Sequence, residues 1–485
     1  MFEPFDRPAL SQRPRDGTTS LVPGEARCPG PSVQDLIARD AMPAPAVLSS
    51  ENYEFLGDAD VDAARYVSQS WFDREMQAIW PRTWQWACRD EHIEEAGDYY
   101  VYEVGPFSVI VIRQQDGGVR AFLNSCLHRG TKLRPCEGEG HAHNLRCPYH
   151  GWTWAIDGTL DKVPCAWDFP HVEPERFSLP EVAVGRWGGF IFINLDENPQ
   201  PFEEYLGVLP DHFANWDLAD RYVSLHMSKE LHCNWKTAME AFLESYHVYE
   251  THPQLMTATA DANVQYDCYG DHVSRFYSAG GTQSPHLDRV LSEQELVDAM
   301  LVGDRSMLGE ELTVREGETA RSVMARYLRK AFGQQYGVDL STYSDSEIVD
   351  TIEYHLFPNM VLFPGFSLPM VYRFRPIGMR PDRTQFEILF LRPVPEKGGR
   401  PAPAEIAHVS EQESYAGVPG MDAALGYVYD QDTANLRAQQ LGLTNMLAAG
   451  RKTGQTLGNY QEVRIRHFNR TLDKYLNRFA ARISG

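Results

Sequence analysis

The chain has 485 residues, 43% of them hydrophobic, which is enough for two or three domains with sizeable cores. Its 45 Lys and Arg against 67 Asp and Glu give a net charge of −22, which argues against nucleic acid or an anionic membrane as a ligand. The 8 cysteines are scattered, as is typical of a reducing compartment. Because the sequence has neither a signal-peptide pattern nor about 18 consecutive apolar residues, it predicts a cytoplasmic protein without a membrane span.

The first two segments of the chain differ sharply in composition. Residues 1–50 are rich in proline and predict an extended or mobile N-terminal arm. Residues 51–200 start with an amphipathic helix near Ala63 and continue into strands dense in β-branched and aromatic residues. Asp157-Gly158 is a strong signal for a hairpin turn. We expect a small β domain here.

The third segment, residues 201–485, mixes helices with strands. Residues 280–350 are charged and helical in pattern, and Ser292 to Glu295 has the form of a capping box. A C-terminal helix carries apolar residues on one face from Ile465 to Phe479. Strands are expected at 351–363, 370–375 and 385–392. The fold class is therefore α+β, with an antiparallel sheet and a long terminal helix in the larger domain.

Two short Cys/His motifs lie in the β-rich segment. Cys126 and His128 are separated by one residue, and Cys147 and His150 by two. Two thiolates and two imidazoles suit a structural zinc ion or a [2Fe–2S] cluster with Cys₂ on one iron and His₂ on the other. Zinc fingers usually place like ligands together, whereas each loop here offers one of each kind. The spacing therefore favours the cluster, which passes single electrons.

A second set of candidate ligands follows in the larger domain. Glu240, Glu244 and His247 fall at i, i+4 and i+7, which predicts one helical face. His252 can join them only if the helix ends near it, and Pro253 is a reason for that end. Two histidines and a carboxylate form the facial triad of non-heme Fe(II) oxygenases, which leaves positions open for O₂ and substrate. The alternative is two unrelated histidines at a helix end.

Taken together, these motifs resemble the α subunit of the Rieske non-heme iron, ring-hydroxylating oxygenases. The resemblance extends over roughly residues 50–480. It implies an N-terminal Rieske β domain and a catalytic domain with a helix-grip, START-like sheet. The motifs that carry it are Cys126-x-His128, Cys147-x₂-His150, Asn234-Trp235-Lys236 and Glu244-x₂-His247-x₄-His252.

The resemblance also implies a third iron ligand late in the chain. Tyr429 to Asp432, followed by Gln440-Leu441-Gly442-Leu443, is similar to the family pattern, and its register selects Asp432 rather than Asp430. The alternative is that Glu244 supplies the carboxylate. In the family that position holds a bridging acid, so Glu244 would link His150 of one subunit to His247 of its neighbour in a head-to-tail trimer.

Two residues depart from the family's usual pattern. Glu244 is one methylene longer than the commoner Asp, which puts the geometry of the bridge in question. Ala241 replaces a frequent Asn, which affects hydrogen bonding at the bridge or the pocket floor. Neither change removes a member of the triad.

The activity implied is that of a terminal oxygenase component. A separate flavin reductase, with or without a ferredoxin, would pass electrons from NADH to the Rieske cluster and then to mononuclear Fe(II), where O₂ is activated. The chain has no Gly-rich dinucleotide fingerprint, so NADH and flavin would belong to partner proteins. A homotrimer is expected, and a β subunit is an open alternative.

Four residues are candidates for the substrate pocket: Phe242, Val248, Leu255 and Asn359. An apolar lining favours an aromatic or alicyclic substrate, as in the catabolism of aromatic hydrocarbons. Alternatives are an O- or N-demethylase of the same family, an electron carrier that uses the cluster alone, and a START-like binding module with structural zinc. Dihydroxylation and monohydroxylation are both compatible with the sequence.

Overall fold

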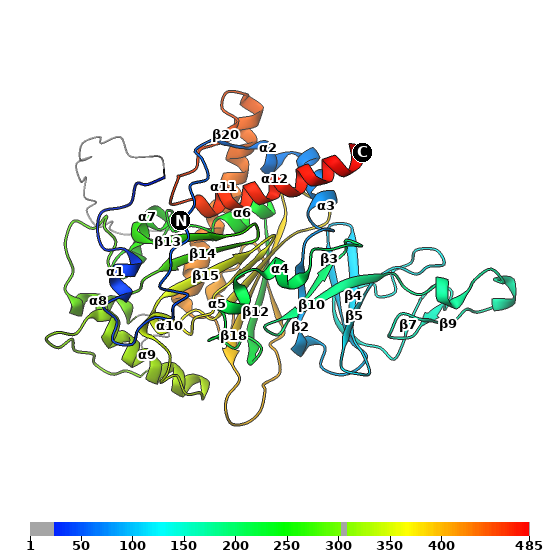
Figure 1. The fold of residues 1–485 in the computed structure, drawn as a ribbon, viewed down its shortest axis with the longest axis horizontal. Helices are drawn as coiled ribbons and strands as arrows, with labels where there is room; N and C mark the ends of the chain where they lie inside the picture. The colour runs from blue at the N-terminus through cyan, green and yellow to red at the C-terminus, as the bar shows by residue number, and fades with distance from the viewer. Residues whose placement is uncertain (1–23, 302–307, 485) are drawn as a thin grey trace.

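The computed structural model describes residues 24–301 and 308–484, which form an elongated molecule of two units (Figure 1). The smaller unit lies at one end and holds the strands near the N-terminal side of the chain, whereas the larger one holds a second sheet and most helices. Among the described helices, none is long and apolar enough to cross a membrane.

The smaller unit is built on a seven-stranded antiparallel sheet with the order β2-β11-β10-β5-β4-β3-β6. Apolar residues such as Ile110 and Ile191 are fully buried, as expected for strands rich in β-branched residues. The strands are β2 (Gln85–Arg89), β3 (Asp98–Val104), β4 (Phe107–Arg113), β5 (Val119–Leu123), β6 (Gly138–His141), β10 (Glu181–Trp187) and β11 (Phe190–Asn194).

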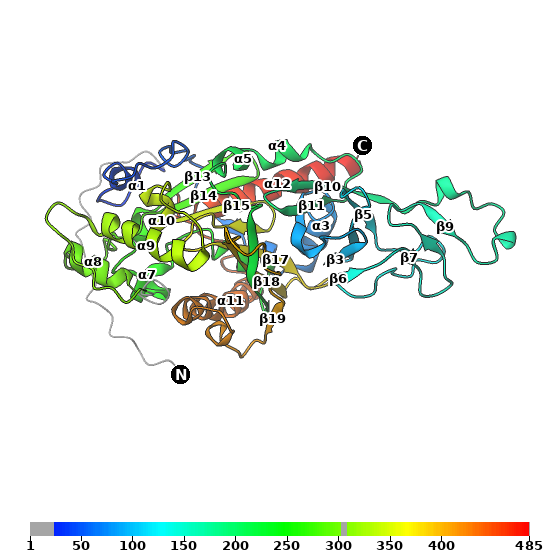
Figure 2. The same cartoon turned by 90° about the horizontal axis from the view of Figure 1, so that it is seen from below.

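A three-stranded sheet projects from this unit to the far end of the molecule (Figures 1 and 2). It contains β7 (Leu145–Arg146), β8 (Thr153–Trp154) and β9 (Leu160–Lys162). β8 and β9 pair antiparallel around Asp157-Gly158, where Gly158 has a φ of 84°. This confirms the hairpin turn that the sequence predicts.

The larger unit contains an eight-stranded sheet with the order β13-β14-β15-β16-β17-β18-β12-β19. All pairings in it are antiparallel except that of β12 with β19. Its strands are β12 (Arg221–Leu231), β13 (Gln265–Tyr269), β14 (Val273–Ser278), β15 (Thr351–Leu356), β16 (Met360–Leu362), β17 (Met370–Pro376), β18 (Thr384–Pro393) and β19 (Ile406–Val409). A small pair joins β1 (Val61–Asp62) to β20 (Gly454–Gln455).

Three helices of the larger unit pack on this sheet or on one another. α6 packs on β17 and β18, α11 packs on α6 and β12, and α12 packs on β13 and β14. Ile465, Phe468, Leu472 and Tyr475 of α12 are buried, as the apolar spacing predicts. The helices are α1 (Val33–Ile37), α2 (Ala64–Val67), α3 (Gln69–Ala78), α4 (Phe202–Leu206), α5 (Leu209–His212), α6 (Trp235–Glu240), α7 (Val248–Thr251), α8 (Glu293–Met300), α9 (Ala320–Tyr336), α10 (Asp345–Val349), α11 (Ala423–Ala449) and α12 (Val463–Ser484).

The predicted arm is partly wrong. Residues 24–50 pack on the larger unit, because Val33, Ile37 and Leu48 are buried in its core. The guanidinium of Arg27 also lies 3.8 Å from the centre of the Tyr460 ring. The prolines therefore indicate an irregular but packed segment, and residues 1–23 lie outside the described part of the chain.

A buried ion pair joins the two units' helices. Lys236 of α6 donates from Nζ to both carboxylate oxygens of Glu75 in α3, at 2.7 and 2.9 Å, and both side chains are fully buried. Trp235 Nε1 donates to the same carboxylate at 3.0 Å. The Glu75 charge is thus fully compensated by buried partners.

Removing one partner of this pair should destabilise the protein strongly. Lys236→Met leaves the Glu75 carboxylate buried without its cation, which costs about 3–5 kcal/mol. A urea titration of the purified protein would measure the loss. Lys330→Met is the matched control, because its pair with Glu310 is half exposed and is worth at most about 1 kcal/mol. Equal losses in the two variants would contradict this account.

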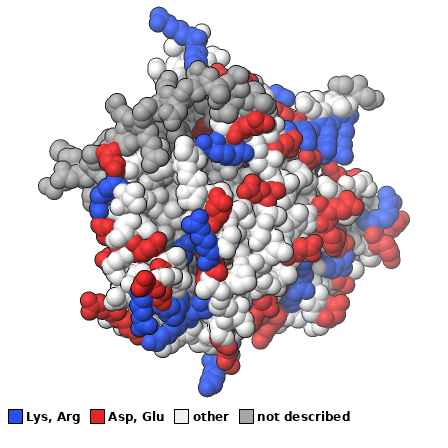
Figure 3. Space-filling view, turned by 60° about the vertical axis from the view of Figure 1, so that its left-hand side comes forward, with Lys and Arg blue, Asp and Glu red and all other residues white. Residues whose placement is uncertain are grey.

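The surface carries more acidic than basic side chains, in keeping with the net charge of −22. On the face in Figure 3, red patches of Asp and Glu are interspersed with blue ones of Lys and Arg, and white residues separate them. A single-sign basic surface, which a nucleic-acid ligand would need, is not seen on that face.

Candidate metal centres and pocket

The two Cys/His loops have closely similar backbones. In the first, which follows β5, Gly130 N–H donates to Cys126 C=O at 2.9 Å. In the second, between β7 and β8, Gly151 N–H donates to Cys147 C=O at 3.1 Å. Gly130 and Gly151 have φ values of 79° and 74°, where a side chain would be strained. Each glycine thus closes a tight turn that presents one Cys and one His.

These two loops bring the four predicted cluster ligands together. His128 Nδ1 and His150 Nδ1 lie 3.2 Å apart, and the His128 ring stacks on Trp152 at 5.2 Å between centroids. Both cysteines are buried, whereas both histidines are half exposed. The paired imidazole nitrogens fit ligands of one iron, and the two buried thiols are the ligands available to the other.

Backbone donors around the cysteines favour a thiolate at one of them. Burial raises the pKa of the Cys126 thiol. For Cys147, burial is outweighed by the backbone N–H groups of Tyr149 and His150, so its pKa is lowered. Since the thiolate is the form that binds metal, the second loop is electrostatically prepared for a cluster.

The second candidate site is held by short helices rather than one long one. The prediction of a single helical face for Glu240, Glu244 and His247 is wrong, because α6 ends at Glu240. Glu240 is buried and accepts from Tyr66 and Asn469 at 2.8 and 3.0 Å. After this break, His247 and His252 flank the one-turn helix α7 as its N-cap and C-cap residues. The helix end expected near Thr251 is confirmed.

A long helix supplies the third member of the site. Ligand atoms of His247, His252 and Asp432 all lie within 4.8 Å of one another. Asp432 Oδ1 is 2.7 Å from His252 Nε2 and 3.5 Å from His247 Nε2. Two imidazole nitrogens and one carboxylate oxygen, converging on one point, suit a divalent metal ion and leave other coordination positions open.

The two neighbouring acids point elsewhere. Asp430 accepts from the Ser414 hydroxyl and from Tyr415 N–H, because two residues on an α-helix differ by about 200° in direction. Glu244 lies on the other side of His247, where its Oε1 is 2.7 Å from Nδ1. The structure therefore groups Asp432, and neither Asp430 nor Glu244, with the two histidines.

The charges around His247 match a cation site. Burial lowers the pKa of His247, but the carboxylates of Glu244 and Asp432 more than offset it and raise that pKa to about 10. Burial would raise the pKa of Asp432, and its hydrogen bonds with the two histidines hold it below its ordinary value instead. Positive charge is thus strongly favoured between these groups, so a bound metal ion would replace the imidazolium proton.

Gln431 is a site residue that the sequence analysis missed. Its Oε1 lies 2.9 Å from His252 Nδ1 and also accepts from Gln254 Nε2 at 2.6 Å. An acceptor at Nδ1 fixes the ring tautomer and leaves Nε2 free for a metal ion. Its position directly before Asp432 in the family-like pattern was the only available signal.

Loss of this acceptor should weaken metal binding. Gln431→Leu leaves His252 Nδ1 without a partner, which lowers the iron affinity of the mononuclear site by about 10- to 100-fold. Anaerobic Fe(II) titration of apoprotein, followed by metal analysis, would measure it. Gln431→Glu keeps an acceptor oxygen and serves as the control. An unchanged affinity in the leucine variant would exclude this role.

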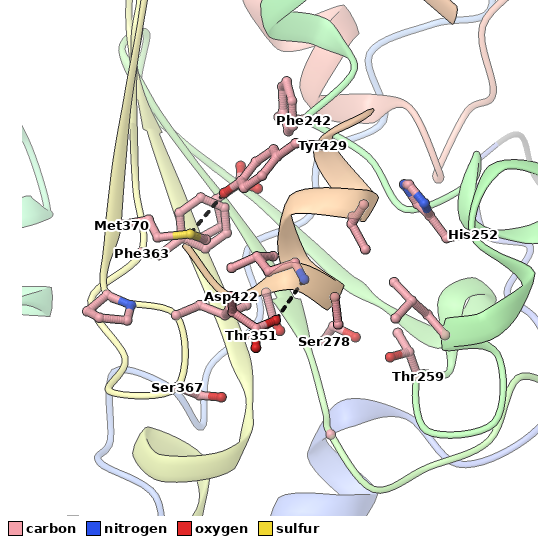
Figure 4. A pocket seen from close by; sticks show the side chains of 18 of the residues that line it. Phe242, His252, Thr259, Ser278, Thr351, Phe363, Ser367, Met370, Asp422 and Tyr429 are labelled. Atoms are coloured by element: carbon pink, nitrogen blue, oxygen red, sulfur yellow. Dashed lines mark hydrogen bonds between the residues drawn. The ribbon is translucent and has the colours of Figure 1, made fainter. Parts of the chain in front are cut away.

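The three grouped residues open onto a large pocket. The cavity is about 590 Å³ and lies between one face of the eight-stranded sheet and α11, with α8 and α9 at its side. Figure 4 shows His252 on one side of it and Met370, Phe363 and Ser367 on the opposite side, with Phe242 and Tyr429 between them. Tyr429 donates from its hydroxyl to Met370 Sδ at 2.9 Å, which ties α11 to β17.

Three of the four predicted pocket residues line this cavity: Phe242, Val248 and Leu255. Asn359 does not. It is buried beneath the sheet's surface, where its Nδ2 donates to Phe374 C=O at 3.0 Å. Its amide completes a strand-to-strand contact, so the prediction was wrong for this residue. Met300 and Phe332 show that the 280–350 insertion contributes to the wall.

Family models match most of the described chain. Residues 83–173 match the Rieske [2Fe–2S] domain. Residues 213–478 match the ring hydroxylating alpha subunit catalytic domain. The two matches follow the two structural units and include all seven residues grouped above.

The chain spans about half the length of the curated relatives that it matches. The glycine betaine monooxygenase oxygenase subunit of Pseudomonas aeruginosa (strain UCBPP-PA14) is 33% identical over 193 residues, which is 39% of this chain and 44% of that protein. The benzene 1,2-dioxygenase subunit alpha of Pseudomonas putida is 33% identical over 194 residues, 39% of this chain and 43% of that protein.

Solved structures support the fold over a longer range. A quaternary ammonium Rieske monooxygenase superposes with a TM-score of 0.61 at 19% identity, covering 88% of this chain and 99% of the other. A naphthalene 1,2-dioxygenase variant bound to phenanthrene gives 0.59 at 19% identity, covering 87% and 93%. At these identities the likeness concerns the fold.

Proposed function

Since the chain belongs to the ring-hydroxylating oxygenase alpha-subunit family, we propose that it is the terminal component that oxidises an organic substrate with O₂ in the 590 Å³ pocket. The observation that carries the proposal is the convergence of His247, His252 and Asp432 on one side of that pocket. An electron carrier would need neither this triad nor a cavity beside it.

Two metal groups belong to such a chain, a Rieske [2Fe–2S] cluster and a mononuclear iron. When bound, the cluster supplies single electrons, and the iron supplies a site at which O₂ is activated. Cys126, His128, Cys147 and His150 would hold the first, and His247, His252 and Asp432 the second. Gln431 and Glu244 orient the imidazoles through their Nδ1 atoms.

The two centres of one chain lie far apart, which supports electron transfer between chains. The lobe of β7 to β9, with His150, is at the end of the molecule away from α7 and α11 (Figures 1 and 2). Glu244 contacts His247, and nearby Tyr246 is 62% exposed. Tyr149, next to His150, is 59% exposed, so each centre lies close to the surface. In a head-to-tail homotrimer, Glu244 would contact His150 of the neighbouring copy.

The pocket supports a substrate with a large apolar body. Most of its lining is apolar, and Phe242, Phe363 and Tyr372 supply flat aromatic surface. The matched relatives are named for quaternary ammonium compounds as well as for benzene, so they do not support aromatic hydrocarbon catabolism in particular. Apolar substrate oxidation, as hydroxylation or demethylation, is therefore the broader proposal.

A quaternary ammonium substrate is the second candidate. The carboxylate-bearing Glu353 and Asp422 line the same cavity as its aromatic rings. Carboxylates and aromatic faces together attract cations that cannot donate hydrogen bonds. Monooxygenation at an N-methyl group would follow, as a form of the demethylase alternative.

Electrons would come from partner proteins. A flavin reductase, alone or with a ferredoxin, would take them from NADH and dock near the exposed edge of the cluster loops. A β subunit fits the proposal but is not required by it. The acidic surface would favour a partner with complementary basic residues.

A single-turnover reaction tests the proposed function. Chemically reduced holoprotein would be mixed with ¹⁸O₂ and one member of each substrate class: naphthalene, a steroid, and glycine betaine. We expect one substrate to yield a product that contains ¹⁸O, or its demethylated counterpart with labelled formaldehyde. Cluster reoxidation without any oxygenated product from any of them would favour an electron carrier.

A further inference from the structure

One basic side chain lies in the pocket wall. The residues at 386, 388, 390 and 392 alternate onto one face of β18, and Phe390 and Arg392 of this set line the cavity. Among the described residues that line it, Arg392 is the only Lys or Arg. Arg392 is half buried in this wall, where its positive charge faces the cavity.

Arg392 differs from the two arginines of the neighbouring strand β17. Arg373 and Arg375 on β17 both pair with Glu387, at 2.7 and 2.9 Å. None of the ion pairs among the described residues includes Arg392. Its guanidinium lies 5.7 Å from the centre of the Tyr336 ring of α9, a contact that leaves the N–H edge available.

Asp422, an acid of the same pocket, has a structural task. Its side chain caps α11, where Oδ1 accepts from Leu425 N–H at 2.8 Å. Replacing that hydrogen bond with a link to Arg392 would leave the first turn of α11 uncapped. The Asp422 carboxylate therefore has partners within the protein and holds the start of α11.

Strand register places Arg392 away from the iron triad. Tyr429 is one turn before Asp432 on α11 and donates to Met370 Sδ. Met370 is the cross-strand partner of Phe390, and Arg392 lies about 7 Å farther along β18. The cavity thus extends from the iron triad, past Tyr429 and Met370, to the guanidinium of Arg392.

We propose that Arg392 binds a carboxylate at the end of the substrate that is remote from the oxidised carbon. This inference rests on the proposed function. It narrows the substrate to one class, molecules with an apolar body and a terminal carboxylate. The planar guanidinium would donate two parallel N–H···O hydrogen bonds to that carboxylate. Because Arg392 lies away from the iron triad along β18, this pairing would hold the anionic end of the substrate away from the metal and so orient the substrate.

We call the proposed Arg392–carboxylate contact the anchor. Matched acids and amides test it by measuring binding, without any turnover. The probes are ω-(2-naphthyl)alkanoates of increasing chain length and their primary amides, titrated calorimetrically into anaerobic holoprotein. The wild-type chain should bind the best acid about 10- to 100-fold more tightly than its amide. In Arg392→Gln that preference should vanish through weaker acid binding, with the amide unchanged, whereas Arg392→Lys should retain part of it.

Arg380→Gln is the matched control, because Arg380 lies on the loop between β17 and β18 and does not line the cavity. Its acid preference should equal that of the wild type. An acid preference that survives in Arg392→Gln, or equal affinities for acid and amide in the wild type, would overturn the anchor. Failure to bind any acid of the series would also overturn it.

Failure of the anchor and failure of the proposed function give different results. Iron content and single-turnover oxygenation are measured on the same preparations. If the protein binds iron and forms labelled product but shows no preference for the acid, only the anchor is disproved. If the acid preference depends on Arg392 but the protein oxygenates no substrate, the carboxylate-binding site is supported and the oxygenase function is disproved.

Discussion

Asp432→Ala should remove the mononuclear iron while the Rieske cluster stays intact. Asp432 supplies the only carboxylate oxygen grouped with His247 and His252 among the described residues. Two imidazoles alone hold Fe(II) weakly, so iron should fall from about three to about two per chain. Oxygenation should then be lost, whereas the visible spectrum of the cluster should not change.

Asp430→Ala is the control for this substitution. Asp430 is also on α11 but faces Ser414 and Tyr415, so its loss should leave the iron content at wild-type level. The ligand assignment fails if the Asp432 variant keeps its iron and Glu244→Ala loses it. That outcome would revive Glu244 as the third ligand.

Glu244→Gln should separate the two metal centres electronically. The Gln amide keeps the size of the side chain but has one acceptor oxygen where Glu244 has two. Its hydrogen bonds to His247 Nδ1 and to the imidazole of the neighbouring copy should therefore weaken. Both metal contents should be normal. Steady-state turnover should fall by about 10- to 100-fold, with slow reoxidation of the reduced cluster as the cause.

Mixed trimers provide the sharper version of that experiment. Cys147→Ser removes the cluster, and Asp432→Ala removes the iron, so each variant is inactive alone. Coexpression should restore part of the activity, because electrons cross from a cluster in one copy to an iron in the next. No recovery in verified mixed trimers would place the electron path within one chain and remove the bridge assigned to Glu244.

Local sequence patterns predicted the cluster loops well. Cys126, His128, Cys147 and His150 lie on turns set by nearby glycines, so spacing alone determines most of their geometry. The hairpin at Asp157-Gly158 and the C-terminal helix are local features of the same kind.

Features that depend on contacts far apart in the sequence were predicted less well. The helix expected to run on past Glu240 is broken, because that side chain turns into a buried network with Tyr66 and Asn469. Gln431 orients His252 across 179 positions of sequence. Asn359 was expected in the pocket but is buried in a contact with Phe374, whereas Arg392, which lines the cavity, was not singled out from the sequence.

The N-terminal segment illustrates the same limit. Proline content predicted an extended arm over residues 1–50, and within the described residues 24–50 the one α-helix, α1, is only 5 residues long. Whether such a segment packs depends on grooves in the rest of the molecule. Val33 and Ile37 find apolar partners there, which composition could not indicate.

The count of iron and acid-labile sulfide per chain tests the two-centre account most directly. Purified, anaerobically reconstituted protein should hold about three irons and about two sulfides, with a Rieske-type EPR signal after reduction. About two irons with about two sulfides would contradict the account, because the His247, His252 and Asp432 site would then bind no iron.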